Sequence, residues 1–168
     1  MTKKLFKEKW IKRIFDYYKK LDPSQIPHTQ SVIEYTIKIC DAINVDEERT
    51  NKLLIAAAAH DIGCPISKKK YGDTSPDHQQ TEGRLIVQQW LQDETTLTTF
   101  EKEWAAQVVG THHQRPSAIE FHFEELFDAD LIVNTLEEEK ISQKRLTDRE
   151  SRMITAAGKQ FYRHLFLE

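Results

Sequence analysis

Residues 53–63 decide the fold, and their sequence is Leu-Leu-Ile-Ala-Ala-Ala-Ala-His-Asp-Ile-Gly. The stretch is apolar on every side as far as Ala59, which is typical of a helix at the centre of a bundle. Its alanines allow neighbouring helices to approach closely. His60 and Asp61 fall in the last turn, where backbone carbonyl dipoles favour a cation. We therefore expect a central helix over roughly Glu48–Asp61 that ends in two polar side chains.

The rest of the chain is also expected to be helical. Apolar residues recur at intervals of three and four almost throughout, and no alternation of period two is long enough for a sheet. Gly63 and Pro65 are stop signals after the central helix, and residues 62–77 form the longest irregular stretch. The other predicted helices span about 3–21, 27–39, 76–91, 98–112, 117–135 and 147–165. We predict an all-α, single-domain helical bundle of about six or seven helices over residues 1–168.

Several helix starts have a capping pattern. Thr98, Ser117 and Thr147 each precede a glutamate by three residues, which is the spacing of a capping box. Ser75-Pro76 has the pattern of an N-cap followed by the first helical residue. We therefore expect helices to begin at these four places.

Composition limits the class of protein and of partner. A chain of 168 residues with 39% hydrophobic and 30% charged residues is expected to be one globular domain. With a net charge of −3 and no long basic block, nucleic acid is not an expected partner. No apolar run approaches the ~20 residues that span a bilayer, and the N-terminus lacks the core of a signal peptide. Two cysteines, Cys40 and Cys64, favour a reducing compartment, so we expect a cytoplasmic protein without a membrane partner.

Polar residues lie on apolar helix faces at three further positions. His28 is in phase with Val32 and Ile39, and His112 and Asp130 continue similar apolar stripes. A buried carboxylate costs several kcal/mol unless it is paired or binds a metal. Together with His60-Asp61, these residues indicate a metal site built from several helices.

The ligand types limit the metal. Imidazole and carboxylate groups suit iron, manganese, nickel or zinc, and no C-x-x-C pattern competes with them. We expect one or two divalent ions as cofactor, with Fe, Mn, Ni, Zn and Mg left open.

The whole pattern resembles that of the HD-domain metal-dependent phosphohydrolases. Their signature is a histidine, a later His-Asp doublet and a distant aspartate, here His28, His60-Asp61 and Asp130. The resemblance covers about residues 27–137. It implies the HD-domain fold, which is a helical bundle, and a metal-dependent hydrolase.

The sequence is also similar to the binuclear branch of that family, in particular to HD-type hydrolases of symmetrical dinucleoside tetraphosphates. This resemblance implies second-metal ligands at His78 and at His112 or its neighbour His113. Spacing from Asp130 and the apolar stripe favour His112, which leaves His113 as a group near the site. Asp61 would bridge the two metals.

Such a site would activate water for direct attack on phosphorus. Asp61, His60 and Asp130 are the expected catalytic residues, and either aspartate could accept the proton of the attacking water. No nucleophile motif such as G-x-S-x-G is present, so a covalent intermediate is not expected.

The expected substrate is a small phosphorylated molecule, such as a nucleotide. Its phosphates require cations that do not bind metal, and the candidates are Lys68, Lys69, Lys70, Arg84 and Arg115. Many family members have a lysine directly after the His-Asp-x-Gly turn, where this chain has Cys64. Because of that difference, the substrates of the better-known branches are not transferred to this chain.

Two other classes of protein have related sequences. HD-type mixed-valent diiron oxygenases use nearly the same ligands to activate oxygen, but the lysine-rich segment at residues 68–70 favours phosphate. A non-catalytic, metal-binding sensor module tends to lose the doublet or the last aspartate, and both are present here. His122 and His164 lie outside the pattern. The long first helix and its aromatic residues permit a homodimer.

Overall fold

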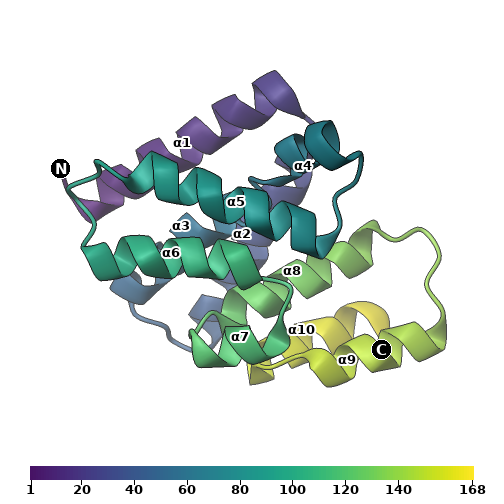
Figure 1. Cartoon of the computed structure of the whole chain (residues 1–168). Coiled ribbons are helices and arrows are strands. Elements are labelled where there is room, and N and C mark those ends of the chain that lie inside the picture. Colours follow the sequence, from purple (N-terminus) through teal and green to yellow (C-terminus); the bar gives the residue numbers. More distant parts are fainter.

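Helix α3 (Glu47–Ala59) lies at the centre of the molecule, as predicted (Figure 1). All of its residues from Leu53 to Ala59 are buried, and α1, α2, α6 and α8 pack against it. The computed structural model describes residues 1–168 and contains helices without strands, so the all-α prediction is confirmed. The other helices are α1 (Lys3–Leu21), α2 (Gln25–Ala42), α4 (Cys64–Tyr71), α5 (Pro76–Leu91), α6 (Thr99–Thr111), α7 (Arg115–Glu120), α8 (Glu124–Glu137), α9 (Gln143–Arg152) and α10 (Ala156–Phe166).

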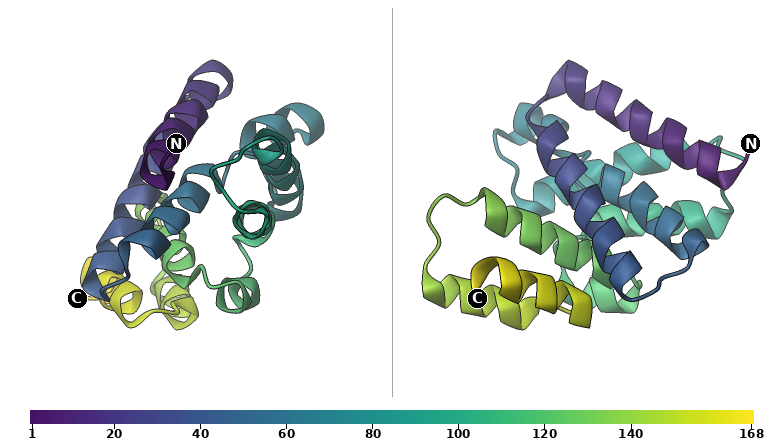
Figure 2. Two further views of the ribbon diagram at one scale, coloured as in Figure 1. Left: turned by 90° about the vertical axis from the view of Figure 1, so that its left-hand side faces the viewer. Right: turned by 180° about the vertical axis from the view of Figure 1, so that it is seen from behind.

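The helices pack in pairs around α3. The pair α5 and α6 lies on one side, α2 packs along α8, and α10 packs against α8 and α9 (Figure 2). Helix α1 crosses α3 and buries Phe6, Trp10, Ile14 and Tyr18. The Trp10 indole nitrogen donates a hydrogen bond to the Ile55 carbonyl oxygen at 3.0 Å. None of these helices is both long enough and apolar enough to cross a bilayer.

Two of the four expected helix starts are confirmed. Thr98 and Glu101 form a reciprocal capping box at the start of α6, with both hydrogen bonds in place. Pro76 is the first residue of α5, although the Ser75 hydroxyl makes no capping bond.

The other two starts are wrong, for different reasons. Ser142 caps α9, so the N-cap of this helix lies five residues before Thr147. Ser117 lies inside the short α7, and the chain turns at His122, with φ 59°, before α8 begins.

The structure also differs from the prediction at residues 62–77, which are not irregular. Pro65 lies in the first turn of α4 rather than acting as a stop signal, because proline is tolerated where helical N–H groups have no partner. Gly72, with φ 78°, ends α4. Likewise, the predicted last helix is divided into α9 and α10 by an extended turn at Met153. The chain therefore has more and shorter helices than expected.

Candidate metal centre

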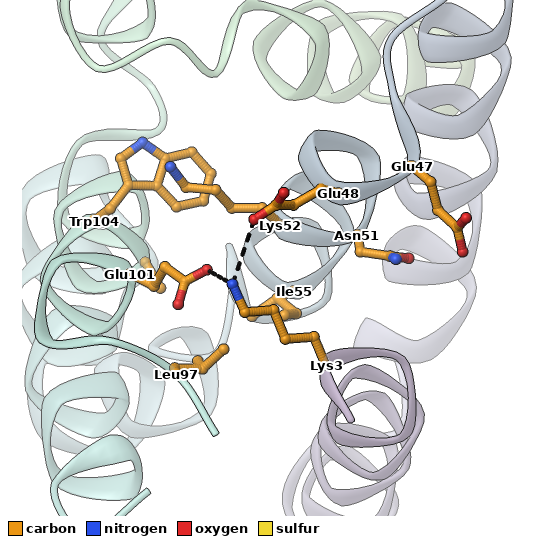
Figure 3. Close-up of a pocket in the computed structure, with 10 residues that line it drawn as sticks. Lys3, Glu47, Glu48, Asn51, Lys52, Ile55, Leu97, Glu101 and Trp104 are labelled. Atoms are coloured by element: carbon orange, nitrogen blue, oxygen red, sulfur yellow. Dashed lines mark hydrogen bonds and ion pairs between the residues drawn. The ribbon is translucent and has the colours of Figure 1, made fainter. Parts of the chain in front are cut away.

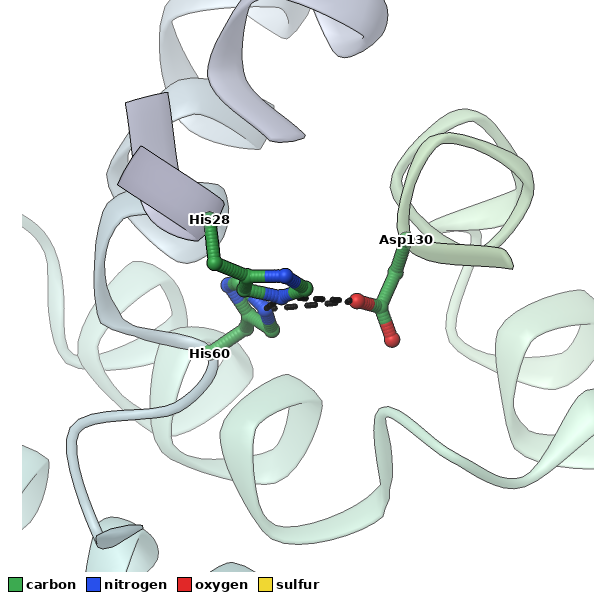
Figure 4. Close-up of side chains that lie close together, drawn as sticks. All are labelled: His28, His60 and Asp130. Carbon is green, nitrogen blue, oxygen red and sulfur yellow. Dashed lines mark hydrogen bonds and ion pairs between the residues drawn. The ribbon is translucent and has the colours of Figure 1, made fainter. Parts of the chain in front are cut away.

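Three side chains from three helices meet at the centre of the bundle (Figure 4). His28 lies in the first turn of α2, His60 follows the last residue of α3, and Asp130 lies in the middle of α8. The two Nε2 atoms are 3.1 Å apart. Asp130 Oδ1 lies 3.3 Å from His28 Nε2 and 3.4 Å from His60 Nε2. Because each residue offers one ligand atom to the same space, this group could hold a metal ion.

Asp61 connects this group to a second one. Its Oδ2 atom lies 3.3 Å from Nε2 of both His28 and His60, and its Oδ1 atom lies 3.2 Å from Nε2 of His112. Asp61, His112 and His113 form the second group that could hold an ion. The first group therefore lies beside Oδ2 of Asp61, and the second group lies beside Oδ1 of the same carboxylate.

The orientation of the three central imidazoles is fixed by hydrogen bonds from their other nitrogen. His60 Nδ1 donates to the Ala57 carbonyl oxygen at 2.7 Å, and His112 Nδ1 donates to that of Val109 at 2.9 Å. His28 Nδ1 lies 3.0 Å from both carboxylate oxygens of Glu137. Since Nδ1 carries the hydrogen in each neutral ring, Nε2 presents a lone pair to the centre.

With the rings neutral, as a metal ligand requires, this centre is rich in acceptors and lacks donors. Asp61 Oδ1, Asp130 Oδ1 and His112 Nε2 are buried and have no hydrogen-bond partner. Buried acceptors that face each other are costly unless a cation lies between them. The residues present fit a divalent metal ion, both in donor chemistry and in this unmet demand for positive charge.

The pKa values of the cluster reflect the same demand. Burial lowers the pKa of His60, but the Asp61 and Asp130 carboxylates outweigh it and raise this pKa well above its usual value. Burial raises the pKa of Asp61, but the charge of His60 outweighs it, and the pKa of Asp61 lies well below its usual value. Burial also raises the pKa of Asp130, but His28 and His60 outweigh it and hold this pKa well below its usual value, so both carboxylates stay ionised and available to a cation.

Helix α5 positions His113. The Gln79 side-chain amide nitrogen lies 2.8 Å from His113 Nε2, and Gln80 Oε1 accepts the His113 backbone N–H at 3.1 Å. Gln79 Oε1 is buried without a hydrogen-bond partner. If this side-chain amide rotates by half a turn, Oε1 accepts a hydrogen bond from His113 Nε2–H, and the Nδ1 atom of His113 then has a free lone pair. Burial, together with His112, lowers the pKa of His113 to about 4, which keeps the ring neutral.

These glutamines were missed by the sequence analysis. A signal for Gln79 was present, because it lies one helical turn before Gly83 and two turns before Val87, on the buried face of α5.

His78 is not brought to the cluster. Its ring stacks on Tyr71 with centroids 4.0 Å apart, and its Nδ1 atom lies 2.7 Å from Asp73 Oδ1. The side chain is 40% exposed and belongs to neither ligand group.

The cations expected to bind phosphate also lie elsewhere. Lys68 pairs with Asp22 and Lys70 with Glu82, while Lys69 is exposed. Arg84 lines a pocket on another face, and Arg115 Nε donates to the Arg152 carbonyl oxygen. None of these five side chains lines a cleft at the cluster.

Two clefts open onto the cluster. One, of about 460 Å³, is bordered by His112, His113 and Asp130, by one face of α8, and by Arg149 and Arg152 of α9. The other reaches His28 and Asp61 from the side of α4. Both include Asn134 and Glu137, so the cluster is reachable from solvent on either side of these α8 residues.

A third pocket, between α1, α3 and α6, contains no residue of the cluster (Figure 3). Lys3 spans its mouth and pairs with Glu101 at 2.6 Å and Glu48 at 3.4 Å. Its lining combines Ile55, Leu97 and Trp104 with charged side chains and contains no histidine, so it lacks the imidazole ligands that the cluster provides.

This is a helical bundle whose buried histidines and aspartates, from facing helices, form a site that could hold a metal ion. The chain belongs to the HD-domain family, whose model, the HD domain, matches residues 26–157. HD domains bind divalent metals and form a superfamily of the metal-dependent phosphohydrolase type. A search of curated proteins and a search of solved structures each gave no match.

Proposed function

We propose that this protein hydrolyses a phosphate ester or anhydride of a small molecule, such as a nucleotide, with one or two divalent metal ions. The observation that carries the proposal is the convergence of three imidazole Nε2 lone pairs on Asp61 and Asp130, whose Oδ1 atoms lack any partner. Membership of the HD-domain family supports the same class of reaction.

In this proposal each ligand group holds one ion. His28, His60 and Asp130 would hold the first, and Asp61, His112 and His113 would hold the second, with Asp61 lying between the two groups. A bound ion would lower the pKa of a coordinated water and neutralise charge on the phosphoryl oxygens.

The chain's own groups have separate tasks. The Glu137 carboxylate fixes the His28 ring through a hydrogen bond with its Nδ1 atom. Backbone carbonyl oxygens fix the rings of His60 and His112 in the same way, so the three imidazoles keep their orientation. Asp61 and Asp130 remain ionised, so both carboxylates can hold a cation at the site. The burial of His60 and His112 keeps bulk water away from one side of the cluster.

The test is phosphate release by protein purified without chelators and analysed for metal. The substrates would be nucleotides, dinucleoside polyphosphates and guanosine tetraphosphate. His60→Ala and Asp130→Ala should lose at least about a hundredfold in kcat/KM, since each removes a ligand. His164→Ala is a matched control, because its side chain is 80% exposed.

Activity that survives in both ligand variants would refute the proposal. Oxygen uptake by the iron-loaded protein, without phosphate release, would assign the chain to the diiron oxygenases instead. Metal binding without either activity would leave a sensor module.

A further inference from the structure

We propose that the cleft between α8 and α9 admits the anionic substrate and that Arg152 binds its negative charge. This inference rests on the proposed function and adds to it a substrate-binding residue and a direction of approach. It concerns α9, which the sequence analysis did not connect with the site.

The cleft joins the candidate ion site to α9. Its floor is one face of α8, on which Phe127, Asp130 and Asn134 follow each other at helical spacing. His112 and His113 border one side, and Arg149 and Arg152 border the other. A molecule bound in this cleft would therefore contact both the ligand groups and the guanidinium side chains.

The two arginines differ in how their charge is used. Arg149 donates to Glu138 and to Thr135 Oγ1, so its charge is already neutralised by a carboxylate. The Arg152 guanidinium makes no ion pair or hydrogen bond, and its Cζ atom lies 5.5 Å from the centroid of the Phe127 ring. Only Arg152 therefore offers this cleft an unpaired positive charge.

Two contacts hold Arg152 in position. The Arg152 carbonyl oxygen accepts a hydrogen bond from Arg115 Nε at 2.9 Å, which fixes the end of α9. The Phe127 face attracts the guanidinium without using its N–H donors. Those donors remain free to bind a phosphate or carboxylate group in bidentate fashion.

Binding of an anionic substrate in this cleft requires the positive charge of Arg152. Asp130 and Glu137 border it with negative side chains, which repel an anionic substrate. The five cations expected from sequence lie elsewhere, and Arg149 is paired. We infer that the ions and Arg152 share the substrate's negative charge.

The test uses inorganic phosphate as the probe and does not depend on turnover. Phenylglyoxal modifies free arginine side chains, and mass spectrometry locates the modified residue. In the metal-loaded protein, phosphate should protect Arg152 but not Arg163, an exposed arginine of α10. Arg152→Ala should weaken phosphate binding by about ten- to a hundredfold, and Arg163→Ala should leave it unchanged. Arg152→Lys should lie between the two, because it keeps the charge and loses the bidentate contact.

The outcomes separate this inference from the proposed function. Phosphate release with unprotected Arg152 and unchanged phosphate binding in Arg152→Ala would overturn the inference and leave the hydrolase. Protection of Arg152 in a protein that hydrolyses no phosphate compound would support an anion site and remove the hydrolase.

Discussion

Gly63 lies directly against the backbone of α5 at Gln79. A Cβ atom on Gly63 would be 2.0 Å from the Gln79 carbonyl oxygen and 2.5 Å from the backbone nitrogen of Gly83. The φ angle of Gly63 is −77°, so close approach rather than backbone conformation requires glycine here. This contact brings α5, with Gln79 and Gln80, next to the residues that follow α3.

Gly63→Ala should therefore destabilise the fold. A methyl group has no space against the α5 backbone, and overpacking costs about 1–3 kcal/mol or more. Urea unfolding would measure the loss. Gly110→Ala is the matched control, since its Cβ would meet only the flexible Arg84 side chain, at 3.0 Å from Cδ. Equal stability of Gly63→Ala and the wild-type protein would show that the start of α4 and α5 are less close.

Asp128 should anchor the C-terminal helices to α8. Its carboxylate is buried and accepts the backbone N–H groups of Ile154 and Thr155, at 2.9 and 2.7 Å, and the Thr155 hydroxyl. Asp128→Ala would leave these donors without a partner, which costs about 1–3 kcal/mol. Thermal unfolding would measure the loss, and Asp148→Ala, on the exposed face of α9, is the control. A stable Asp128→Ala protein would mean that α10 is held by its apolar contacts alone.

Metal content should distinguish His113 from His78 as a ligand. If the centre is binuclear, His113→Ala should reduce the bound metal from two ions per chain to about one. His78→Ala should leave it unchanged, because His78 stacks on Tyr71 outside both groups. Elemental analysis after gel filtration measures the ratio. The reverse result would move the second ion towards α4 and the start of α5.

Removal of metal should lower the melting temperature. A ligand that binds only the folded chain stabilises it by about 2.7 kcal/mol at a hundred times its Kd. For a chain of this length that corresponds to about 5–10 °C. Differential scanning fluorimetry with and without a chelator would measure the shift in melting temperature. The control variant His164→Ala should show the same shift as the wild-type protein. If His60→Ala shows the same shift as the wild-type protein, the ion is bound elsewhere.

The inward-facing positions of the cluster could be predicted because helical periodicity alone determines them. His28 and Asp130 continue apolar stripes on α2 and α8, and both are buried. The end of α3 at His60-Asp61 followed from the change from alanine to polar residues. Helical periodicity and the change of residue type are local features of the sequence, so these predictions do not depend on which helices pack against each other.

The sequence could not show that the lysines expected to bind phosphate are already paired, because their partners come from distant segments. Lys68 pairs with Asp22 from the end of α1, and Lys70 pairs with Glu82 from α5. A lysine-rich segment gives no sign that its charges are already neutralised. The position of Arg152 beside the cluster depends on how α9 packs, which no local pattern determines.

The ligand residues all precede residue 138, whereas Arg149 and Arg152 follow it on α9. If Arg152 binds the substrate as proposed, the part of the chain that would hold the metal and the part that would contact the compound can change independently during evolution. Relatives with the same histidines and aspartates but a different C-terminal segment would act on different compounds. Exchanging that segment between two of them would then exchange their preferences and leave the chemistry intact.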